Sequence, residues 1–208
     1  MGVKVKICGI TSVKDALAVA YSGADAIGLV FYPKSSRYIS IEQAIEICAV
    51  LPPFITIVAL FLDAEKSIVE EVINKVPVNI LQFHGSESPE YCRSFSLPYM
   101  KAVGMIGLDN FSEYADKYTD AKAFLVDGHA PGAAGGTGNS FNWQDIPSDY
   151  PKPIILAGGL NPDNIADAIR STSVYAMDLS SGVEILPGIK SEEKITALMQ
   201  EVKRVEHE

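Results

Sequence analysis

Short apolar runs alternate with longer segments whose apolar residues recur every three or four positions, along the whole chain. The short runs are typical of strands that are buried on both faces of a parallel sheet. The recurring pattern is typical of helices that bury one face. The predicted strands are residues 3–8, 26–31, 55–62, 78–83, 99–103, 123–126, 153–157 and 174–179.

The segments between these strands predict helices with one apolar face. The first three helices are predicted to bury Val13, Ala16, Leu17, Ala20 and Tyr21, then Ile41, Ala44, Ile45, Cys48 and Ala49, then Ile68, Val69, Val72, Ile73 and Val76. Later helices are predicted to bury Tyr91, Cys92 and Phe95, then Ile165, Ala168 and Ile169, then Ile195, Leu198, Met199 and Val202. A weaker helix is expected over residues 111–118, and Asn161 is expected to cap a helix ahead of Pro162.

A strand followed by a helix therefore recurs about eight times, with no linker that would divide the chain. This pattern predicts one α/β domain over residues 1–208, a (βα)8 TIM barrel in which each strand is followed by its helix. An open, doubly wound sheet is the alternative. That fold favours a G-x-G-x-x-G fingerprint after the first strand, and the segment from Cys8 to Thr11 does not supply one.

Composition and charge narrow the choice of partner. The 208 residues include 17 basic and 26 acidic ones, giving a formal net charge of −9. Such a chain is not expected to bind nucleic acid or an anionic membrane, because both require a basic face. The three cysteines are far apart and form no CxxC pair, which favours a reducing compartment, and the expected location is the cytoplasm. We expect a monomer, with a homodimer left open.

The candidate chemistry lies where the predicted strands end, since active sites of α/β barrels are built at the carboxyl ends of the strands. The residues at or just after these ends are Cys8, Lys34 and Arg37, His84, Asp127, Gly158 and Gly159, and Asp178 with Ser180, Ser181 and Gly182. These residues are scattered through the sequence, but a closed barrel would bring them to one mouth.

Glycine-rich turns after the last two strands predict a phosphate site. Phosphate oxygens can approach backbone N–H groups closely where no Cβ intervenes, and a helix N-terminus adds attraction. The turns at Gly158-Gly159 and Ser181-Gly182 are at the strands where barrels usually bind phosphate. The segment 135–138, GGTG, adds a third glycine-rich turn. The alternative is that these glycines only form tight turns.

Cys8 and Asp127 are the candidate pair for proton transfer. A thiol has a pKa of about 8.5 and can act as a base after modest tuning, and a buried carboxylic acid can act as an acid. Cys8 could instead be a small packed residue, as Cys48 and Cys92 on helix faces are expected to be. Arg37 is a candidate partner for a carboxylate. With three histidines in the chain, no metal centre is predicted, and His84 is expected to form hydrogen bonds or stack at the rim of the site.

The chain resembles the phosphoribosylanthranilate isomerase family of tryptophan biosynthesis in several segments, in order: KICGIT (6–11), LQFHG (81–85), DG (127–128) with GGTG (135–138), and DLSSGVE (178–184). The resemblance implies a cofactor-free Amadori rearrangement of N-(5-phosphoribosyl)anthranilate. It implies that Asp127 is the general acid, Cys8 the general base and Arg37 the partner of the anthranilate carboxylate.

The resemblance also implies that Asp178 lies near the anthranilate and that Gly136, Gly159, Ser181 and Gly182 hold the phosphate. Two positions depart from the family, Ser36 where proline is common and Asn139 where a basic residue is common. These departures concern loop order and phosphate affinity, and remove no group that transfers a proton. Residues 128–134 are expected to act as a lid over the sugar.

Two other functions remain open on this scaffold. One is a phosphosugar epimerase that uses a metal ion, or an aldolase that forms a Schiff base, for which Lys101 would be the least implausible lysine. The other is a phosphate-ligand sensor without catalytic activity.

Overall fold

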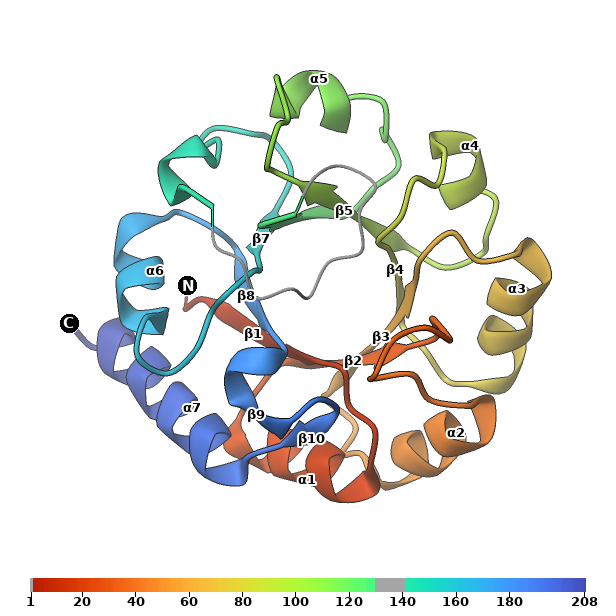
Figure 1. Ribbon diagram of the computed structural model, residues 1–208, viewed down its shortest axis with the longest axis horizontal. Coiled ribbons are helices and arrows are strands. Elements are labelled where there is room, and N and C mark those ends of the chain that lie inside the picture. Colours follow the sequence, from red (N-terminus) through yellow and green to blue (C-terminus); the bar gives the residue numbers. More distant parts are fainter. Residues whose placement is uncertain (1, 130–140) are drawn as a thin grey trace.

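Eight parallel strands close into a barrel in a computed structural model that describes residues 2–129 and 141–208 (Figure 1). The strands are β1 (Lys4–Cys8), β2 (Ala26–Val30), β3 (Thr56–Phe61), β4 (Ile80–Phe83), β5 (Tyr99–Gly104), β6 (Ala123–Asp127), β7 (Ile154–Leu156) and β8 (Ala176–Leu179). They follow one another in chain order around the barrel, and β1 pairs with β8 to close it. The predicted fold class is therefore confirmed.

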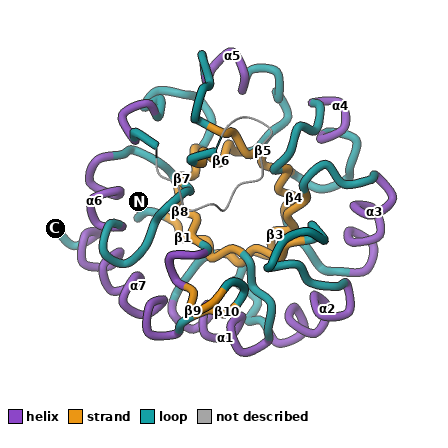
Figure 2. The backbone as a smooth tube through the Cα atoms, viewed as in Figure 1, coloured by secondary structure: helices purple, strands orange, loops and turns teal. Residues whose placement is uncertain are grey.

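An outer ring of helices covers the strands (Figure 2). The helices are α1 (Val13–Ser22), α2 (Ile41–Val50), α3 (Lys66–Lys75), α4 (Pro89–Cys92), α5 (Phe111–Ala115), α6 (Ile165–Ser171) and α7 (Glu192–Glu206). Two 3-10 turns, η1 (Trp143–Asp145) and η2 (Ser181–Val183), and a small antiparallel pair, β9 (Glu184–Leu186) with β10 (Ile189–Lys190), complete the described elements. Between β6 and β7, the described residues form only η1, so the regular alternation is interrupted there.

Two apolar layers hold the barrel together. The larger cluster packs helix side chains against outward-facing strand residues such as Ile7, Leu81 and Phe124. The smaller cluster, which includes Met100, Ala102 and Leu125, comes from the strands and from Ala157 just after β7, and it fills the barrel. Because side chains alternate along a strand, residues next to the outward-facing ones point into the barrel. This alternation decides which polar side chains can reach the site.

The predicted helix faces are partly wrong. Tyr21, Ile45 and Ile68 are 78%, 42% and 42% exposed, and Ala49 is also exposed. Their helices instead bury pairs three residues apart, Ala16 with Val19, Ala44 with Ile47 and Val69 with Val72. A short helix has several possible stripes of residues that are spaced three or four positions apart. The tilt of the helix against the sheet determines which of these stripes is buried.

Three of the predicted helix boundaries also move. The helix expected to carry Tyr91, Cys92 and Phe95 ends at Cys92, so Phe95 lies beyond it. The N-cap of α6 is Asn164 rather than Asn161, whose side chain accepts a hydrogen bond from the N–H of Asp163 in the turn before the helix. The helix expected over 111–118 ends at Ala115. The last helix is confirmed, with Ser191 as its N-cap and all four predicted core residues buried.

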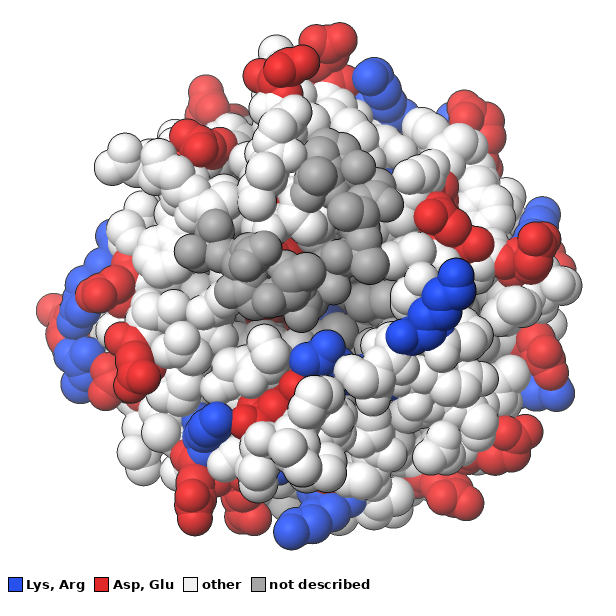
Figure 3. Space-filling view, viewed as in Figure 1, with Lys and Arg blue, Asp and Glu red and all other residues white. Residues whose placement is uncertain are grey.

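Charged side chains of both signs are spread over the helices on the face shown in Figure 3. Within the described residues, no helix is long and apolar enough to cross a membrane.

Candidate active site

A cavity of about 290 Å³ opens at the carboxyl ends of the strands. It is lined by Cys8, Val30, Tyr32, Lys34, Ser35, Ser36, Arg37, Leu60, Leu62, Gln82, His84, Asp127, Ala157, Asp178 and Ser180. The five side chains predicted for catalysis and substrate binding (Cys8, Arg37, His84, Asp127 and Asp178) all lie on it. Since they come from five separate parts of the sequence, the closed barrel is what brings them together.

Cys8 ends β1 and its side chain points into the cavity. Its register partner across the sheet is Gly28 on β2, and a Cβ atom built there would lie 2.6 Å from the Cys8 Sγ atom. Glycine at this position therefore makes the room that the thiol occupies. Burial raises the pKa of the Cys8 thiol, while the Lys6 ammonium lowers it and the Asp178 carboxylate raises it.

Lys6 and Asp178 form a buried ion pair directly below Cys8. They are register partners across the closing strands β1 and β8, and Nζ of Lys6 lies 2.8 Å from Oδ1 of Asp178. Burial lowers the pKa of Lys6, but attraction to Asp178 and to Cys8 outweighs it, so the pKa is raised overall. Burial raises the pKa of Asp178. The thiol thus lies beside a charged pair whose members shift its pKa in opposite directions.

Asp127 ends β6 and lies beside two histidines. Its Oδ1 atom accepts a hydrogen bond of 2.7 Å from the N–H of Gly128. Its Oδ2 atom lies 3.8 Å from Nε2 of His84 and 3.9 Å from Nε2 of His129. The Asp127 side chain is 9% exposed, so it is nearly removed from bulk water while still reaching the cavity.

His84 follows β4 and has a polar partner at each ring nitrogen. Nδ1 lies 3.0 Å from Nε2 of Gln82, and Nε2 lies 3.1 Å from Nε2 of His129. Burial lowers the pKa of His84 to about 3, with further contributions from His129, Lys101 and Lys6. The imidazole is therefore neutral at neutral pH and acts as a hydrogen-bonding group.

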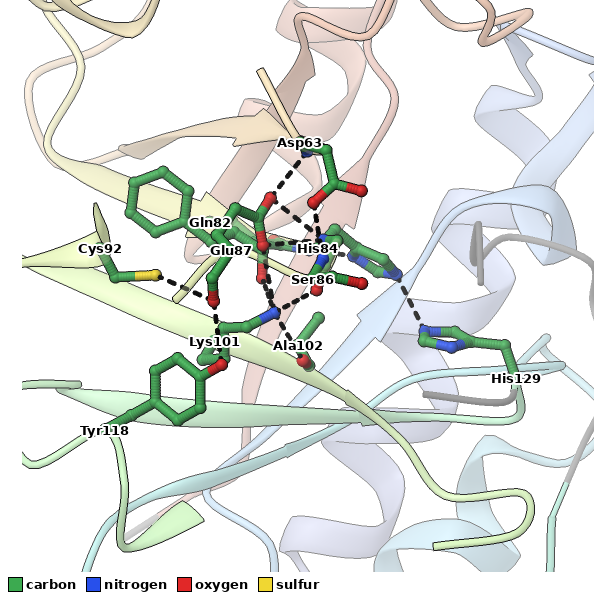
Figure 4. Close-up of polar contacts among 12 residues, drawn as sticks. Asp63, Gln82, His84, Ser86, Glu87, Cys92, Lys101, Ala102, Tyr118 and His129 are labelled. Atoms are coloured by element: carbon green, nitrogen blue, oxygen red, sulfur yellow. Dashed lines mark hydrogen bonds and ion pairs between the residues drawn. The ribbon is translucent and has the colours of Figure 1, made fainter. Parts of the chain in front are cut away.

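A buried ion pair behind the cavity holds the turn that follows His84 (Figure 4). Nζ of Lys101 donates to the carbonyl oxygens of Phe83 and Gly85, at 3.3 and 2.6 Å. The carboxylate of Glu87 accepts from the N–H of Gly85 at 3.0 and 3.1 Å and from the N–H of Asp63 at 2.9 Å. Because the neighbours of Lys101, Met100 and Ala102, point into the barrel, Lys101 points away from it.

Arg37 already has a carboxylate partner within the chain. Its Nε and Nη2 atoms donate to the two oxygens of Glu184, at 2.8 and 2.7 Å. Lys190 also reaches Glu184, at 2.8 Å. Burial alone would raise the pKa of Glu184, but hydrogen bonds from Arg37 and Lys190 hold it below its usual value. The stem of Arg37 crosses Gly9, where a Cβ atom would lie 2.4 Å from its Cδ.

The glycine turns after β7 and β8 lie against each other at the edge of the cavity. Gly158 and Gly159 have φ angles of 91° and 66°, values that favour glycine. A Cβ atom at Gly182 would lie 1.9 Å from the carbonyl oxygen of Leu160, so the two turns touch there. Ala157 and Ser180, which precede these turns, line the cavity.

Backbone N–H groups in these turns are available to a ligand. In the described part of the chain, the N–H groups of Gly159, Ser181 and Gly182 have no hydrogen-bond acceptor. Gly136, the fifth predicted phosphate residue, and most of the predicted lid fall in residues 130–140, outside the described residues.

Sequence reasoning missed several residues that shape this site. Lys6 carried a signal, since a charged residue interrupts an otherwise apolar strand. Gly28 is a glycine inside a predicted strand, and such a glycine can mark a place where another group approaches the backbone closely. Glu184 and Lys190 lie 147 and 153 positions beyond Arg37, and their meeting depends on the loop after β8. His129 had no pattern that linked it to His84.

The fold and the site define an α/β barrel with a thiol and a carboxylate that face one cavity at the carboxyl ends of its strands. Residues 5–201 match the family model described as N-(5'phosphoribosyl)anthranilate (PRA) isomerase. The N-(5'-phosphoribosyl)anthranilate isomerase of Nitrosospira multiformis is 49% identical over 203 residues, covering 97% of each chain. The chain belongs to the phosphoribosylanthranilate isomerase family.

Two solved structures support this assignment. The crystal structure of phosphoribosyl anthranilate isomerase from Thermotoga maritima is 41% identical, with a TM-score of 0.87, covering 97% of this chain and 99% of that one. A second, in complex with reduced 1-(o-carboxyphenylamino)-1-deoxyribulose 5-phosphate, is 39% identical with a TM-score of 0.84, covering 97% and 99%. The resemblance noted in the sequence is thus confirmed.

Proposed function

We propose that the chain converts N-(5-phosphoribosyl)anthranilate to 1-(2-carboxyphenylamino)-1-deoxyribulose 5-phosphate, with Asp127 as general acid and Cys8 as general base. One observation carries the proposal. The thiol at the end of β1 and the carboxylate at the end of β6 line the same cavity. An aldose-to-ketose conversion needs one group that gives a proton and one that takes a proton, and this cavity offers both.

The proton movements follow from these two roles. Asp127 in its acid form donates a proton to the ribose ring oxygen, and the ring opens to a Schiff base. The Cys8 thiolate then takes the proton from C2′, and the electron pair of that bond moves to form an enolamine. Tautomerisation of the enolamine gives the ketone. Lys6 favours the thiolate, because its ammonium lowers the pKa of Cys8.

The rest of the substrate is bound by groups around this pair. The N–H groups of Gly159, Ser181 and Gly182 would bind the phosphate together with Gly158 and Gly136. Arg37, fixed by Glu184, offers its remaining Nη1 nitrogen to the anthranilate carboxylate. His84 contributes a neutral imidazole. Asp178 holds the Lys6 ammonium beside the thiol through its ion pair, and it faces the anthranilate.

The aldolase and sensor hypotheses fit the site less well. A Schiff-base aldolase needs a lysine in the cavity, but Lys101 is 0% exposed, points toward the helices and bonds to Glu87. Lys34 is the one lysine among the described residues that line the cavity, and it is exposed in the loop after β2. A sensor without catalytic activity would leave the shared cavity of Cys8 and Asp127 unexplained.

Freshly generated phosphoribosylanthranilate, in buffer with EDTA, tests the proposal. Wild-type protein should remove the anthranilate fluorescence faster than the spontaneous background. Cys8→Ala and Asp127→Asn should each lower kcat by about 100-fold or more, as expected for loss of an acid or base. Cys48→Ala is the matched control, because that thiol is half-buried on α2 and away from the cavity. Near-normal turnover in both site variants would refute the acid–base pair.

A further inference from the structure

We propose that His84, Asp127 and His129 form a binding site for a divalent transition-metal ion of the zinc class, at which the ion inhibits the enzyme. Nε2 of His84 lies 3.1 Å from Nε2 of His129. Oδ2 of Asp127 lies 3.8 and 3.9 Å from those two nitrogens. All three residues are buried, and the three atoms form one compact triangle.

The size of this triangle matches a metal ion. Three atoms with these separations lie on a circle of radius about 2.1 Å, which falls within the ~2.0–2.2 Å of zinc bonds to histidine and carboxylate. An ion near its centre would reach all three atoms through small side-chain shifts. Two imidazole nitrogens and one carboxylate oxygen favour Zn²⁺ or Co²⁺ over Mg²⁺ or Ca²⁺, which prefer oxygen ligands.

The groups around the triangle also suit a metal site, in which outer partners orient the ligands. The N–H of Gly128 donates to Oδ1 of Asp127, and Oδ2 is the oxygen that lies near the two histidines. The side-chain oxygen of Gln82 is buried and has no hydrogen-bond partner in the part of the chain described. A half-turn of that amide would bring this oxygen to Nδ1 of His84, at the position 3.0 Å away. The oxygen would accept a hydrogen bond from the Nδ1–H of His84, and the Nε2 lone pair would then be available to a metal ion.

The turn that follows His84 is held by a separate set of buried hydrogen bonds. Lys101 and Glu87 hold this turn at Gly85. Figure 4 shows the two side chains next to His84. His84 and Asp127 also line the cavity, so an ion can enter from solvent and keep a water molecule at an open coordination position.

Occupation of this site would stop the proposed reaction. A carboxylate bound to a metal ion through Oδ2 cannot carry the proton that Asp127 is proposed to donate. The ion would also stand where the sugar must bind, so inhibition should be competitive with substrate and reversed by EDTA. Metal binding itself does not depend on the proposed isomerase activity.

Direct binding to the full-length protein tests the site. Protein treated with EDTA and desalted is titrated with Co²⁺ by absorption spectroscopy, and with Zn²⁺ in competition with a chromogenic chelator. The wild type should bind one equivalent. His129→Asn should weaken binding by at least about tenfold, since even outer partners of metal ligands contribute roughly 10–100-fold. Asp127→Asn should weaken it similarly.

His207→Asn is the matched control, because His207 is exposed at the end of α7. It should bind as the wild type does. The cobalt spectrum should lack the intense charge-transfer band of a thiolate ligand, which separates this site from one built on Cys8. Absence of one-equivalent binding, unchanged affinity in His129→Asn with a native circular dichroism spectrum, or a thiolate band would each overturn the proposal.

Discussion

Nζ of Lys101 lies 3.2 Å from Oε2 of Glu87, and the two side chains are only 0% and 2% exposed. Such a pair is isolated from water, so each charge depends on the other and on nearby backbone groups. The pair joins β5 to the turn after β4, and that turn carries His84. Its contribution to folding is therefore linked to the placement of a cavity residue.

Removing one member of this pair should destabilise the protein strongly. Lys101→Met should lower the free energy of unfolding by about 3–5 kcal/mol, the range for a buried charge left without its partner. Adding Glu87→Gln should restore part of the loss, because glutamine is neutral and still accepts from the N–H of Gly85. Urea unfolding of the single and double variants measures the difference. The exposed Lys66–Glu70 pair is the control, and Lys66→Met should change stability by less than about 1 kcal/mol. A double variant no more stable than the single one would contradict this.

The thiol of Cys8 should titrate in opposite directions in two variants. Since burial raises its pKa, less thiolate is present at a given pH than for a free cysteine, and alkylation should be slow until the pH is high. Lys6→Met removes a cation and should raise the pKa further. Asp178→Asn removes a carboxylate and should lower it. The rate of iodoacetamide labelling at Cys8, followed by peptide mass spectrometry across pH, measures both shifts.

Cys92 serves as the internal reference in that experiment. It is 0% exposed, and burial raises its pKa to about 12, so it should stay unlabelled while the fold is intact. Labelling profiles of Cys8 that move in the same direction in both variants would show that the Lys6–Asp178 pair does not control the thiol in the way we infer.

Arg37 should affect substrate binding more than turnover. Arg37→Lys keeps the charge but loses the planar, two-pronged hydrogen bonding to Glu184 and the fixed position that it gives. Hydrogen bonds to charged groups are worth about 1.5–3 kcal/mol, so KM should rise by about tenfold or more. Glu184→Gln should raise KM by a smaller factor. Steady-state kinetics measure both, with exposed Arg93→Lys as the neutral control. A lowered kcat with unchanged KM would assign Arg37 to the chemical step instead.

Contact between the two glycine turns should be needed for phosphate binding. Gly182→Ala would place a Cβ atom 1.9 Å from the carbonyl oxygen of Leu160, which must push the turns apart. We expect a loss of about 1–3 kcal/mol of stability and a raised KM. Gly107→Ala is the control, since its φ is +77° but nothing lies within 4 Å of the added atom. That change should cost about 1–2 kcal/mol without affecting KM. Equal KM values in the two variants would remove Gly182 from the proposed phosphate site.

The barrel and its cavity could be predicted because they depend on features that short stretches of sequence contain. Apolar runs that end in Cys8, His84 and Asp127 identify both the strands and the end at which the site is built. Local patterns determine how far a strand extends and which residue follows it. Once the sheet closes, the meeting of these strand ends follows from topology alone.

Side-chain partnerships could not be predicted in this way. Arg37 was expected to meet a substrate carboxylate, but nothing in its neighbourhood indicated that Glu184 would reach it from the loop after β8. Lys101 was considered as a Schiff-base lysine. Side chains alternate along β5, and Lys101 lies on the face that points away from the barrel. The sequence does not show which face of a strand points inward. The predicted burial of Tyr21 and Ile45 was wrong for a similar reason. The spacing of apolar residues shows that a helix has a buried stripe, but it does not locate the centre of that stripe.

The pairing of Lys6 with Asp178 joins the first strand to the last, 172 positions apart. During synthesis, the ribosome completes β1 long before β8 exists. Until then, the ammonium of Lys6 has no counter-charge, and the thiol beside it lacks the environment that sets its proton affinity. A partial barrel would have to bury an uncompensated cation, which is costly. The closing pair therefore favours all-or-none assembly, and Cys8, the proposed general base, acquires its final environment only when β8 has joined β1.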